Sequence, residues 1–245
     1  MKDYTGPIIG DAFGAALDAY WRGTTEAQLL IERDDGFIER NLPSAYFGSP
    51  DGLDEWDAWA LERAAGRVLD VGCGPGRHMA LLQARGLDVT GVDPSALLVA
   101  ICHERGLVAI EGALPDLPTN VGTFDTLLLL GNNLGLLGSR EQAQKILVGL
   151  AAVASPAAQI LATTVDPCPD GCVSDHHQYH QANTDAGRLP GQLMLRARYR
   201  NLADPWFDYL LIAPRDLEEL LSSGPWRLAD YHGSEGRYAV RLIRR

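Results

Sequence analysis

The chain has 245 residues, of which 46% are hydrophobic and 22% are charged, a composition typical of a globular protein with a sizeable core. Its formal net charge is −11, and only the terminal "RLIRR" is strongly basic. Proteins that bind nucleic acid usually carry a basic stripe, so we expect no nucleic-acid partner.

The sequence also argues against membrane insertion and secretion. No run approaches the roughly 20 apolar residues of a membrane span, and "MKDYTGPIIGDAFGAALDAY" carries acids through its apolar part, unlike a signal peptide. The four cysteines do not resemble a disulfide framework. We expect a cytoplasmic monomer or homodimer with no membrane partner.

Residues 1–66 are expected to form an N-terminal helical cap over the substrate. "DAFGAALDAYWRG" and "DGLDEWDAWALERAAG" place apolar residues at helical spacing, and Gly66 is a plausible stop for the second helix. The stretch between them, "NLPSAYFGSPDG", is rich in turn residues.

Residues 67–166 alternate short apolar runs with helical segments. The runs "RVLDVG", "DVTGVD", "LVAIEG", "FDTLLLLG" and "AQILATTVD" predict strands, and "RHMALLQARG", "SALLVAICHERG" and "REQAQKILVGLAAVA" predict helices. This alternation indicates an α/β fold with a doubly wound, mostly parallel sheet covered on both faces.

The alternation stops after Asp166. "GQLMLRARYRN" and "WFDYLLIAP" predict a β-hairpin within an insertion over residues 167–213 that forms part of the substrate pocket. Residues 214–245 follow as the helix "PRDLEELLSSG" and two closing strands, so we expect one structural domain.

The loop "LDVGCGPGRH" carries the strongest signal for a ligand site. Gly72, Gly74 and Gly76 follow a strand and precede a helix, where glycines let the backbone turn and approach a ligand closely. Asp93 ends the next strand, where a carboxylate can accept hydrogen bonds from a ribose diol. The spacing is G-x-G-x-G and not the G-x-G-x-x-G of dinucleotide sites. Asp70 would repel a pyrophosphate but can pair with a cationic amino group, which favours S-adenosylmethionine.

On these residues the chain resembles the class I S-adenosylmethionine-dependent methyltransferases, through "VLDVGCGPG" followed by "VTGVD". The resemblance implies a seven-stranded Rossmann-like sheet, with S-adenosylmethionine as the cofactor. It places Asp70 and the glycines at the methionine end, His78 near the carboxylate and Asp93 on the ribose. The complete set of expected cofactor residues is Asp70, Gly72, Cys73, Gly74, Gly76, His78, Asp93, Pro94, Ala113, Leu114, Gly131, Asn132 and Asn133.

Two positions depart from the family's pattern. Gly112 occupies the place of an acidic residue that accepts from the adenine amino group, so either Glu111 or the backbone of Ala113 and Leu114 takes over. The fourth strand ends in "GNNLG" and not in the N-P-P-Y type of signature found in members that methylate amino groups. Its absence argues against N-methylation of nucleic acid. The paired asparagines there either cap a turn or contact a ligand.

The stretch "PCPDGCVSDHHQYH", residues 167–180, leaves the carboxyl end of the fifth predicted strand, the edge where active sites of such sheets lie. Cys168, Cys172, His176 and His180 recur every fourth residue. A helix rises about 1.5 Å per residue, so these four side chains cannot converge on one tetrahedral metal. We expect no metal. The alternatives are a catalytic base or a polar surface loop, and the base candidates are His176, His177, Tyr179 and His180.

Aromatic residues of the cap and the insertion are candidates for the acceptor pocket, although an aromatic side chain is more often part of a core. The expected substrate residues are Tyr20, Tyr46, Phe47, Trp206 and Tyr209, and Trp21 stands beside them. Arg196, Arg198 and Arg200 share one face of a predicted strand, which is either solvated or meets a substrate carboxylate.

The sequence therefore predicts methyl transfer from S-adenosylmethionine to a small, partly aromatic molecule of the specialised-metabolite type, with oxygen, nitrogen or ring carbon as the acceptor atom. Two alternatives stay open. One is a nicotinamide-dependent oxidoreductase on a similar sheet, and the other is a protein that binds S-adenosylmethionine without catalysis.

Overall fold

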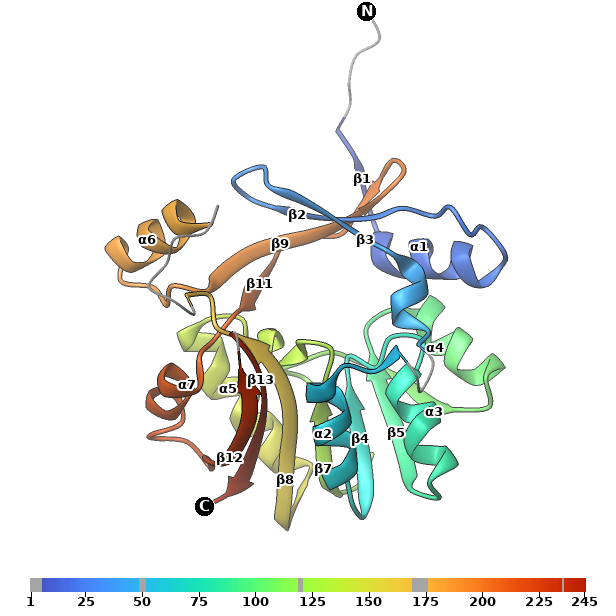
Figure 1. Ribbon diagram of the computed structural model, residues 1–245. Helices are drawn as coiled ribbons and strands as arrows, with labels where there is room; N and C mark the ends of the chain where they lie inside the picture. Colours follow the sequence, from blue (N-terminus) through green and yellow to red (C-terminus); the bar gives the residue numbers. More distant parts are fainter. Residues whose placement is uncertain (1–5, 49–51, 119–120, 169–175, 235) are drawn as a thin grey trace, which may run out of the picture.

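A seven-stranded mixed sheet forms the base of this computed structural model, which describes residues 6–48, 52–118, 121–168, 176–234 and 236–245 (Figure 1). Its strand order is β12-β13-β8-β7-β4-β5-β6. The strands are β4 (Arg67–Val71), β5 (Asp88–Asp93), β6 (Val108–Glu111), β7 (Phe124–Leu129), β8 (Ala154–Val165), β12 (Trp226–Ser234) and β13 (Arg237–Arg244). β13 pairs antiparallel with both of its neighbours, and the other pairs are parallel. The predicted α/β class and seven-stranded, mostly parallel sheet are confirmed.

The central sheet is covered on both faces because its strands are apolar on both faces. One core cluster packs the sheet against α5 (Arg140–Ala152) and α7 (Pro214–Leu220). A second cluster packs it against α2 (Glu55–Arg63) and α3 (Arg77–Ala84). Serine side chains cap α4 (Ala96–Glu104) and α5, where Ser95 and Ser139 accept from backbone N–H groups of the first turn.

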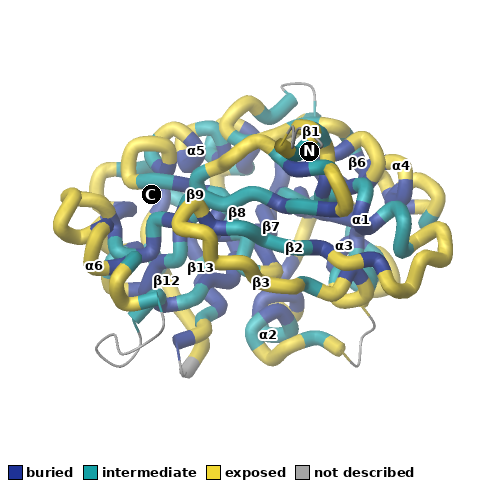
Figure 2. Tube along the Cα trace, turned by 90° about the horizontal axis from the view of Figure 1, so that it is seen from above, coloured by how far each residue is buried: buried dark blue, intermediate teal, exposed yellow. Residues whose placement is uncertain are grey.

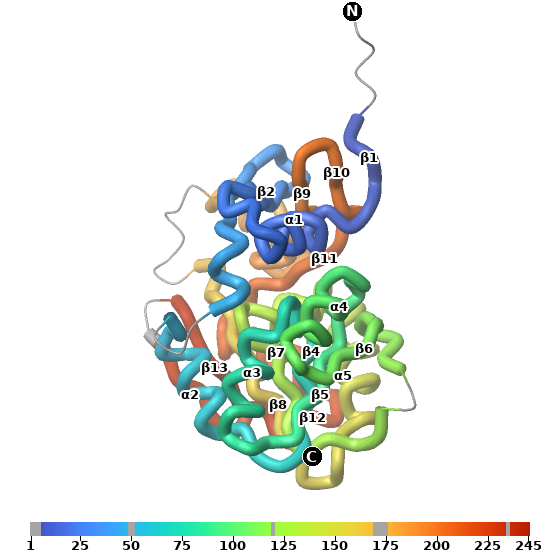
Figure 3. Tube along the Cα trace, turned by 90° about the vertical axis from the view of Figure 1, so that its right-hand side faces the viewer, coloured from blue at the N-terminus to red at the C-terminus, as the bar shows by residue number. Residues whose placement is uncertain are grey.

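A second, smaller sheet lies over the carboxyl edge of the first (Figures 1 and 3). Its order is β1-β10-β9-β2-β3, and β11 pairs with β9 outside this path. The strands are β1 (Ile8–Ile9), β2 (Leu29–Arg33), β3 (Ile38–Asn41), β9 (Gln192–Tyr199), β10 (Leu202–Ala203) and β11 (Phe207–Leu210). A third core cluster joins this sheet to α1 (Ala12–Trp21) and α4. Seen from above, β9, β2 and β3 pass over β8 and β7 (Figure 2).

The expectation of a helical cap over residues 1–66 is incomplete. The segment contains α1 and α2 as predicted, but it also contains β2 and β3, joined at a turn that includes Asp35-Gly36. This dipeptide is a hairpin signal that the sequence analysis missed. β2 pairs with β9, in the register Leu30 to Arg198, so a partner far along the chain stabilises the strand. The predicted hairpin of the insertion is confirmed, because Phe207 pairs with Leu195 in the antiparallel β9–β11 ladder.

Polar contacts at the N-terminus of α1 join the two layers. The Asp204 carboxylate, just after β10, accepts from the N–H of Ala12 at 2.5 Å and of Phe13 at 3.4 Å. Asp11 caps the same helix and accepts from the Ser95 hydroxyl at 2.5 Å. The upper layer is thus fixed to the loop that follows β5. Within the described ranges, no helix is long and apolar enough to cross a membrane.

Trp226 anchors the outer edge of the central sheet and provides a test of this packing. Its side chain is fully buried, and its indole N–H donates to the carbonyl of Leu147 in α5 at 2.9 Å. We expect Trp226→Ala to lower the free energy of unfolding by about 3–5 kcal/mol, since it leaves a large cavity and removes the hydrogen bond to Leu147.

Urea unfolding followed by circular dichroism measures this change. Tyr231→Ala, on the same strand but 53% exposed, is the matched control and is expected to cost about 1 kcal/mol or less. Equal losses in the two variants would contradict the packing described for β12.

Candidate functional site

The glycine loop lies between β4 and α3, where the strand order of the central sheet reverses. β5 and β6 lie on one side of β4 and β7 lies on the other, which is where ligands bind in doubly wound sheets. Gly72, Gly74 and Gly76 have φ values of +69°, +55° and +83°, a conformation that favours glycine. A Cβ at Gly74 would meet no atom within 4 Å, so this part of the loop faces open space. The loop therefore has the backbone geometry predicted for it.

Asp70, the last residue but one of β4, is in an unusual state for a carboxylate. Its side chain is 1% exposed, and its Oδ2 has no hydrogen-bond partner among the residues that the structure describes. Burial raises the pKa of Asp70 to about 6. An unpartnered buried carboxylate is costly unless a cationic or hydrogen-donating ligand completes its contacts.

Asp93 connects the end of β5 to the glycine loop. Its Oδ2 accepts from the N–H of Gly74 at 2.9 Å and its Oδ1 accepts from the N–H of Ser95 at 3.0 Å. Burial raises the pKa of Asp93 to about 6, against the lowering effect of these two hydrogen bonds. Each carboxylate oxygen has a second lone pair for a ligand, so both roles, loop anchor and ribose acceptor, are compatible.

Asp57 of α2 is the main site residue that sequence reasoning missed. Its carboxylate lies 2.7 Å from the Arg77 guanidinium and 3.1 Å from Nε2 of His78. Its other oxygen accepts from the N–H of Gly131 at 3.2 Å and the hydroxyl of Thr163 at 3.3 Å. Burial opposes ionisation of this side chain, but His78 and Arg77 hold the pKa of Asp57 below its usual value. Neither the spacing nor the composition of the helix distinguished this acid from solvent-facing ones.

The β7 end brings the paired asparagines to the glycine loop. The Asn133 amide donates to the carbonyls of Val71 and Gly72 at 3.1 and 2.9 Å. Asn132 has φ +71°, and its buried Oδ1 has no partner within the described part of the chain. From the upper layer, the Tyr209 hydroxyl donates to the carbonyl of Asn132 at 2.5 Å. The two asparagines thus join β7, the glycine loop and β11.

A cavity of about 540 Å³ opens between these loops and the upper layer. Its floor includes Gly72, Pro94, Ala113 and Leu114, all predicted cofactor residues. Its other wall comes from α5 and from the β9–β11 hairpin. The cavity is lined by Val71, Gly72, Val92, Pro94, Gly112, Ala113, Leu114, Pro115, Leu136, Gln142, Lys145, Ile146, Met194, Trp206, Phe207 and Asp208.

The five aromatic candidates for the acceptor pocket fall into two places. Trp206 lines the cavity, and Tyr209 contacts the β7 end. Tyr46 packs edge-to-face on Phe13 of α1, with ring centroids 5.1 Å apart, and burial raises its pKa to about 12.

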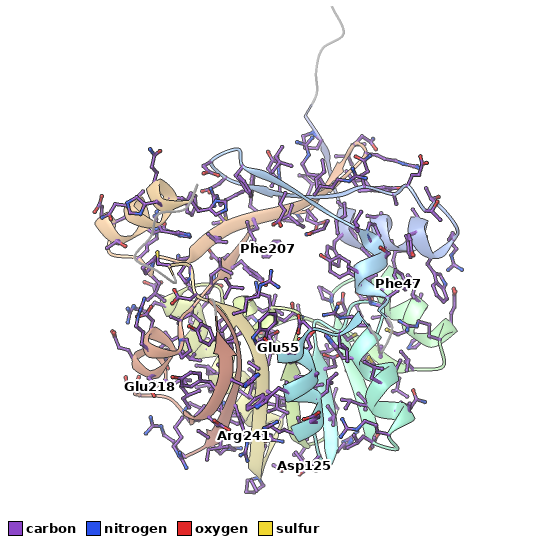
Figure 4. All side chains as sticks on the ribbon, viewed as in Figure 1. Phe47, Glu55, Asp125, Phe207, Glu218 and Arg241 are labelled. Atoms are coloured by element: carbon purple, nitrogen blue, oxygen red, sulfur yellow. The ribbon has the colours of Figure 1, made fainter. Side chains whose placement is uncertain are left out.

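The remaining two, Tyr20 and Phe47, pack with each other, and Phe47 also packs on Trp21. Phe47 stacks on Trp21 at 5.6 Å, on the side of the molecule away from Phe207 (Figure 4). Their contacts are those of a core, which is the ordinary role of aromatic side chains.

The four catalytic candidates lie together on α6 (His177–Asp185) and at its N-cap, His176, beside the upper sheet (Figure 1). Tyr179 donates to the Asp34 carboxylate at 2.6 Å, and its ring lies 4.2 Å below the Arg33 guanidinium.

The three histidines differ in their surroundings. His180 is buried, with Nδ1 2.9 Å from the carbonyl of Pro190, and burial lowers its pKa. Nδ1 of His176 lies 3.2 Å from Arg33, and His177 is exposed. These contacts attach α6 to the upper layer. No observation tests the catalytic assignment, so it stays a prediction.

The metal alternative gains no support within the described residues, which hold no group of three or more histidine, cysteine or acidic side chains that could bind a metal ion. Cys168 is disulfide-bonded, which removes its thiol from such a group. Residues 169–175, including Cys172, lie outside the described residues.

Comparison with known proteins gives three related results. Residues 68–157 match a family model described as a methyltransferase domain. An uncharacterized methyltransferase of Mycobacterium tuberculosis is 34% identical over 96 residues, which cover 38% of this chain and 37% of that protein. A tRNA U34 carboxymethyltransferase of Methylococcus capsulatus is 28% identical over 174 residues, 68% of this chain and 46% of that protein. The matched region thus spans less than half the length of these relatives.

The fold as a whole, including the upper layer, is shared with a solved structure. A methyltransferase from Bacteroides fragilis, solved in complex with S-adenosyl-L-homocysteine, has a TM-score of 0.79 and 23% identity, covering 96% of this chain and 94% of that one. The CcbJ methyltransferase of Streptomyces caelestis has a TM-score of 0.55 and 15% identity, over 82% and 98%. These results show that residues 68–157 match a methyltransferase domain and that the chain has the fold of class I S-adenosylmethionine-dependent methyltransferases.

Proposed function

We propose that the chain transfers a methyl group from S-adenosylmethionine to a small, partly aromatic acceptor held between the two sheets. The observation that carries the proposal is the buried, unpartnered Oδ2 of Asp70 beside a glycine loop whose backbone faces open space. The ammonium group of an amino-acid-bearing nucleoside is the kind of ligand that completes such a carboxylate.

The residues at the site fit this cofactor. Asp70 would accept from its ammonium group and Asp93 from its ribose hydroxyls, while Pro94, Ala113 and Leu114 supply an apolar wall for the base. The cofactor supplies a methyl group already activated on a sulfonium. What remains for the chain is to orient the acceptor, exclude water and, for a hydroxyl or ring-carbon acceptor, receive a proton.

The acceptor class rests on the aromatic character of the upper layer. Tyr209 reaches the β7 end, and Trp206 and Phe207 line the cavity. A planar, partly apolar molecule suits such walls. The proposal includes oxygen, nitrogen and electron-rich ring carbon as acceptor atoms.

Transfer to RNA is the second candidate, because one relative is a tRNA U34 carboxymethyltransferase. The net charge of −11 argues against it, since RNA binding depends on neutralising phosphates. A cytoplasmic location, monomeric or homodimeric state and absence of membrane and nucleic-acid partners stay predictions.

Incubation with S-adenosylmethionine labelled in its methyl group, together with panels of phenols, amines, indoles and bulk tRNA, tests the function directly. Label transferred to a small molecule supports the proposal. Label transferred to tRNA alone would replace it with the second candidate, and cofactor binding without transfer to any acceptor would indicate a non-catalytic protein.

Asp93→Asn tests the ribose contact. The variant keeps the shape of the side chain but removes its charge, so we expect the dissociation constant for S-adenosylhomocysteine, measured by calorimetry, to rise about tenfold or more. Asp88→Asn, at the other end of β5 and exposed, is the matched control and should bind like the wild type. Unchanged affinity in Asp93→Asn would remove this residue from the site.

Asp70→Asn tests how much the buried carboxylate, once ionised, lowers the stability of the ligand-free protein. Because burial raises its folded pKa to about 6 from an ordinary value near 4, the ligand-free protein loses stability as the pH rises through this window. At about 1.4 kcal/mol per pH unit, the stability of the variant relative to wild type should rise by about 2–3 kcal/mol between pH 4 and pH 8. Urea unfolding at the two pH values measures it. A difference independent of pH would contradict the buried state of Asp70.

Tyr209→Phe tests whether the Tyr209 hydroxyl of the upper layer contributes to the rate of methyl transfer. Removing the hydroxyl frees the Asn132 carbonyl at the β7 end, and we expect kcat to fall about tenfold with little change in the affinity for S-adenosylhomocysteine. His177→Ala is measured beside it. A loss of about a hundredfold in His177→Ala, with Tyr209→Phe unaffected, would assign the base to α6 and would show that the Tyr209 hydroxyl does not contribute to kcat.

A further inference from the structure

The resemblance to the family predicts an acidic residue at position 112 that accepts from the adenine amino group, but this chain has Gly112 there. The structure shows that the position cannot hold an acidic side chain. A Cβ at Gly112 would come within 2.9 Å of Pro118 and 3.0 Å of Val92, so position 112 has no room for a side chain. Glu111, the alternative considered from the sequence, is exposed and does not line the cavity. A side-chain acceptor for the base must therefore come from another element, and the alternative is the backbone of Ala113 and Leu114.

Among the described residues that line the cavity, Asp208 of β11 is the one carboxylate. Lys145 and Trp206 also line it, but an ammonium and an indole N–H only donate hydrogen bonds. The Gln142 amide donates to Oδ2 of Asp208 at 2.6 Å. The pair therefore presents a carboxylate as the strongest hydrogen-bond acceptor on this wall.

Asp208 is held in place before any ligand arrives. Its backbone pairs with Met194 in the β9–β11 ladder. Its Cβ packs on Gly138, where an added side chain would approach it to 3.3 Å and where φ is +70°. The carboxylate thus has a fixed backbone, a packed Cβ and a hydrogen-bonded oxygen, which is the arrangement that a recognition group needs.

The residues that line the cavity indicate which part of the cofactor Asp208 would meet. Asp93 at the β5 end is the ribose acceptor of the proposed function, and the glycine loop with Asp70 lies on one side of it. The base would lie on the other side, between Pro94 and the segment from Gly112 to Pro115. Asp208 and Gln142 line the same cavity from the opposite wall.

We infer that Asp208, positioned by Gln142, is the acceptor for the adenine 6-amino group, so that the inserted hairpin takes the place of the missing acidic residue after β6. The inference rests on the proposed function, because it concerns the base of the same cofactor. It makes the specificity for adenine a property of the upper layer and not of the Rossmann-like sheet.

The test compares two nucleosides that differ at one position of the base. S-adenosylhomocysteine carries a 6-amino donor, and S-inosylhomocysteine carries a 6-oxo acceptor that a carboxylate would repel. We expect wild-type protein, titrated by calorimetry, to prefer S-adenosylhomocysteine by about tenfold or more. In Asp208→Asn the amide can donate to the 6-oxo group, so this preference should fall at least about tenfold.

Asp230→Asn, an exposed acid on β12, is the matched control and should keep the wild-type preference. Gln142→Ala should reduce the preference only partly, since Asp208 loses the hydrogen bond that positions it but its carboxylate is still present. A variant that still binds S-inosylhomocysteine is folded, so a loss of preference in Asp208→Asn is distinguished from unfolding. An unchanged preference in Asp208→Asn would overturn the inference and leave the backbone near Ala113 as the adenine partner. No binding of S-adenosylhomocysteine to wild type would instead overturn the proposed function.

Discussion

The buried carboxylate of Asp57 organises the carboxyl edge of the central sheet. It contacts Arg77 and His78 of α3, the N–H of Gly131 after β7 and the hydroxyl of Thr163 in β8. The Arg77 guanidinium compensates the charge of this buried acid, and the other three contacts satisfy its remaining hydrogen-bonding capacity. Through Arg77, which also donates to the carbonyl of Ala45, the same network reaches the segment η1 (Pro43–Tyr46) that leads down from the upper layer.

The upper layer and the glycine loop are therefore connected through one network. Among the polar connections between the layers are those from Arg77 to Ala45, from Asp11 to Ser95, and from Tyr209 to Asn132. Each of them ends within a residue or two of a predicted cofactor residue. A ligand that binds the folded carboxyl edge and not the unfolded chain would stabilise both layers together, since binding to the folded state alone adds to stability.

Most of the central sheet follows from the sequence because its signals are local. Alternating apolar runs and helices, serine caps such as Ser95, and the G-x-G-x-G loop each depend on neighbouring residues. The upper sheet was missed in part because its pairing is not local: Leu30 of β2 lies opposite Arg198 of β9, and no pattern within "QLLIER" reports that partner. Asp57 illustrates the same limit for the site. Its role arises only when α2, α3, β7 and β8 meet, and its sequence context resembles that of any acid near a helix start.

The composite upper sheet has a consequence for how the chain is made. β2 and β3 emerge early from the ribosome, whereas β9, to which β2 pairs, is synthesised about 170 residues later. At roughly 5–20 residues per second, the early hairpin waits on the order of 10–30 seconds for its partner. During that interval its strand edges are open to the pairing that causes aggregation, so the nascent chain has a period in which chaperone access matters more than it does for the later central strands.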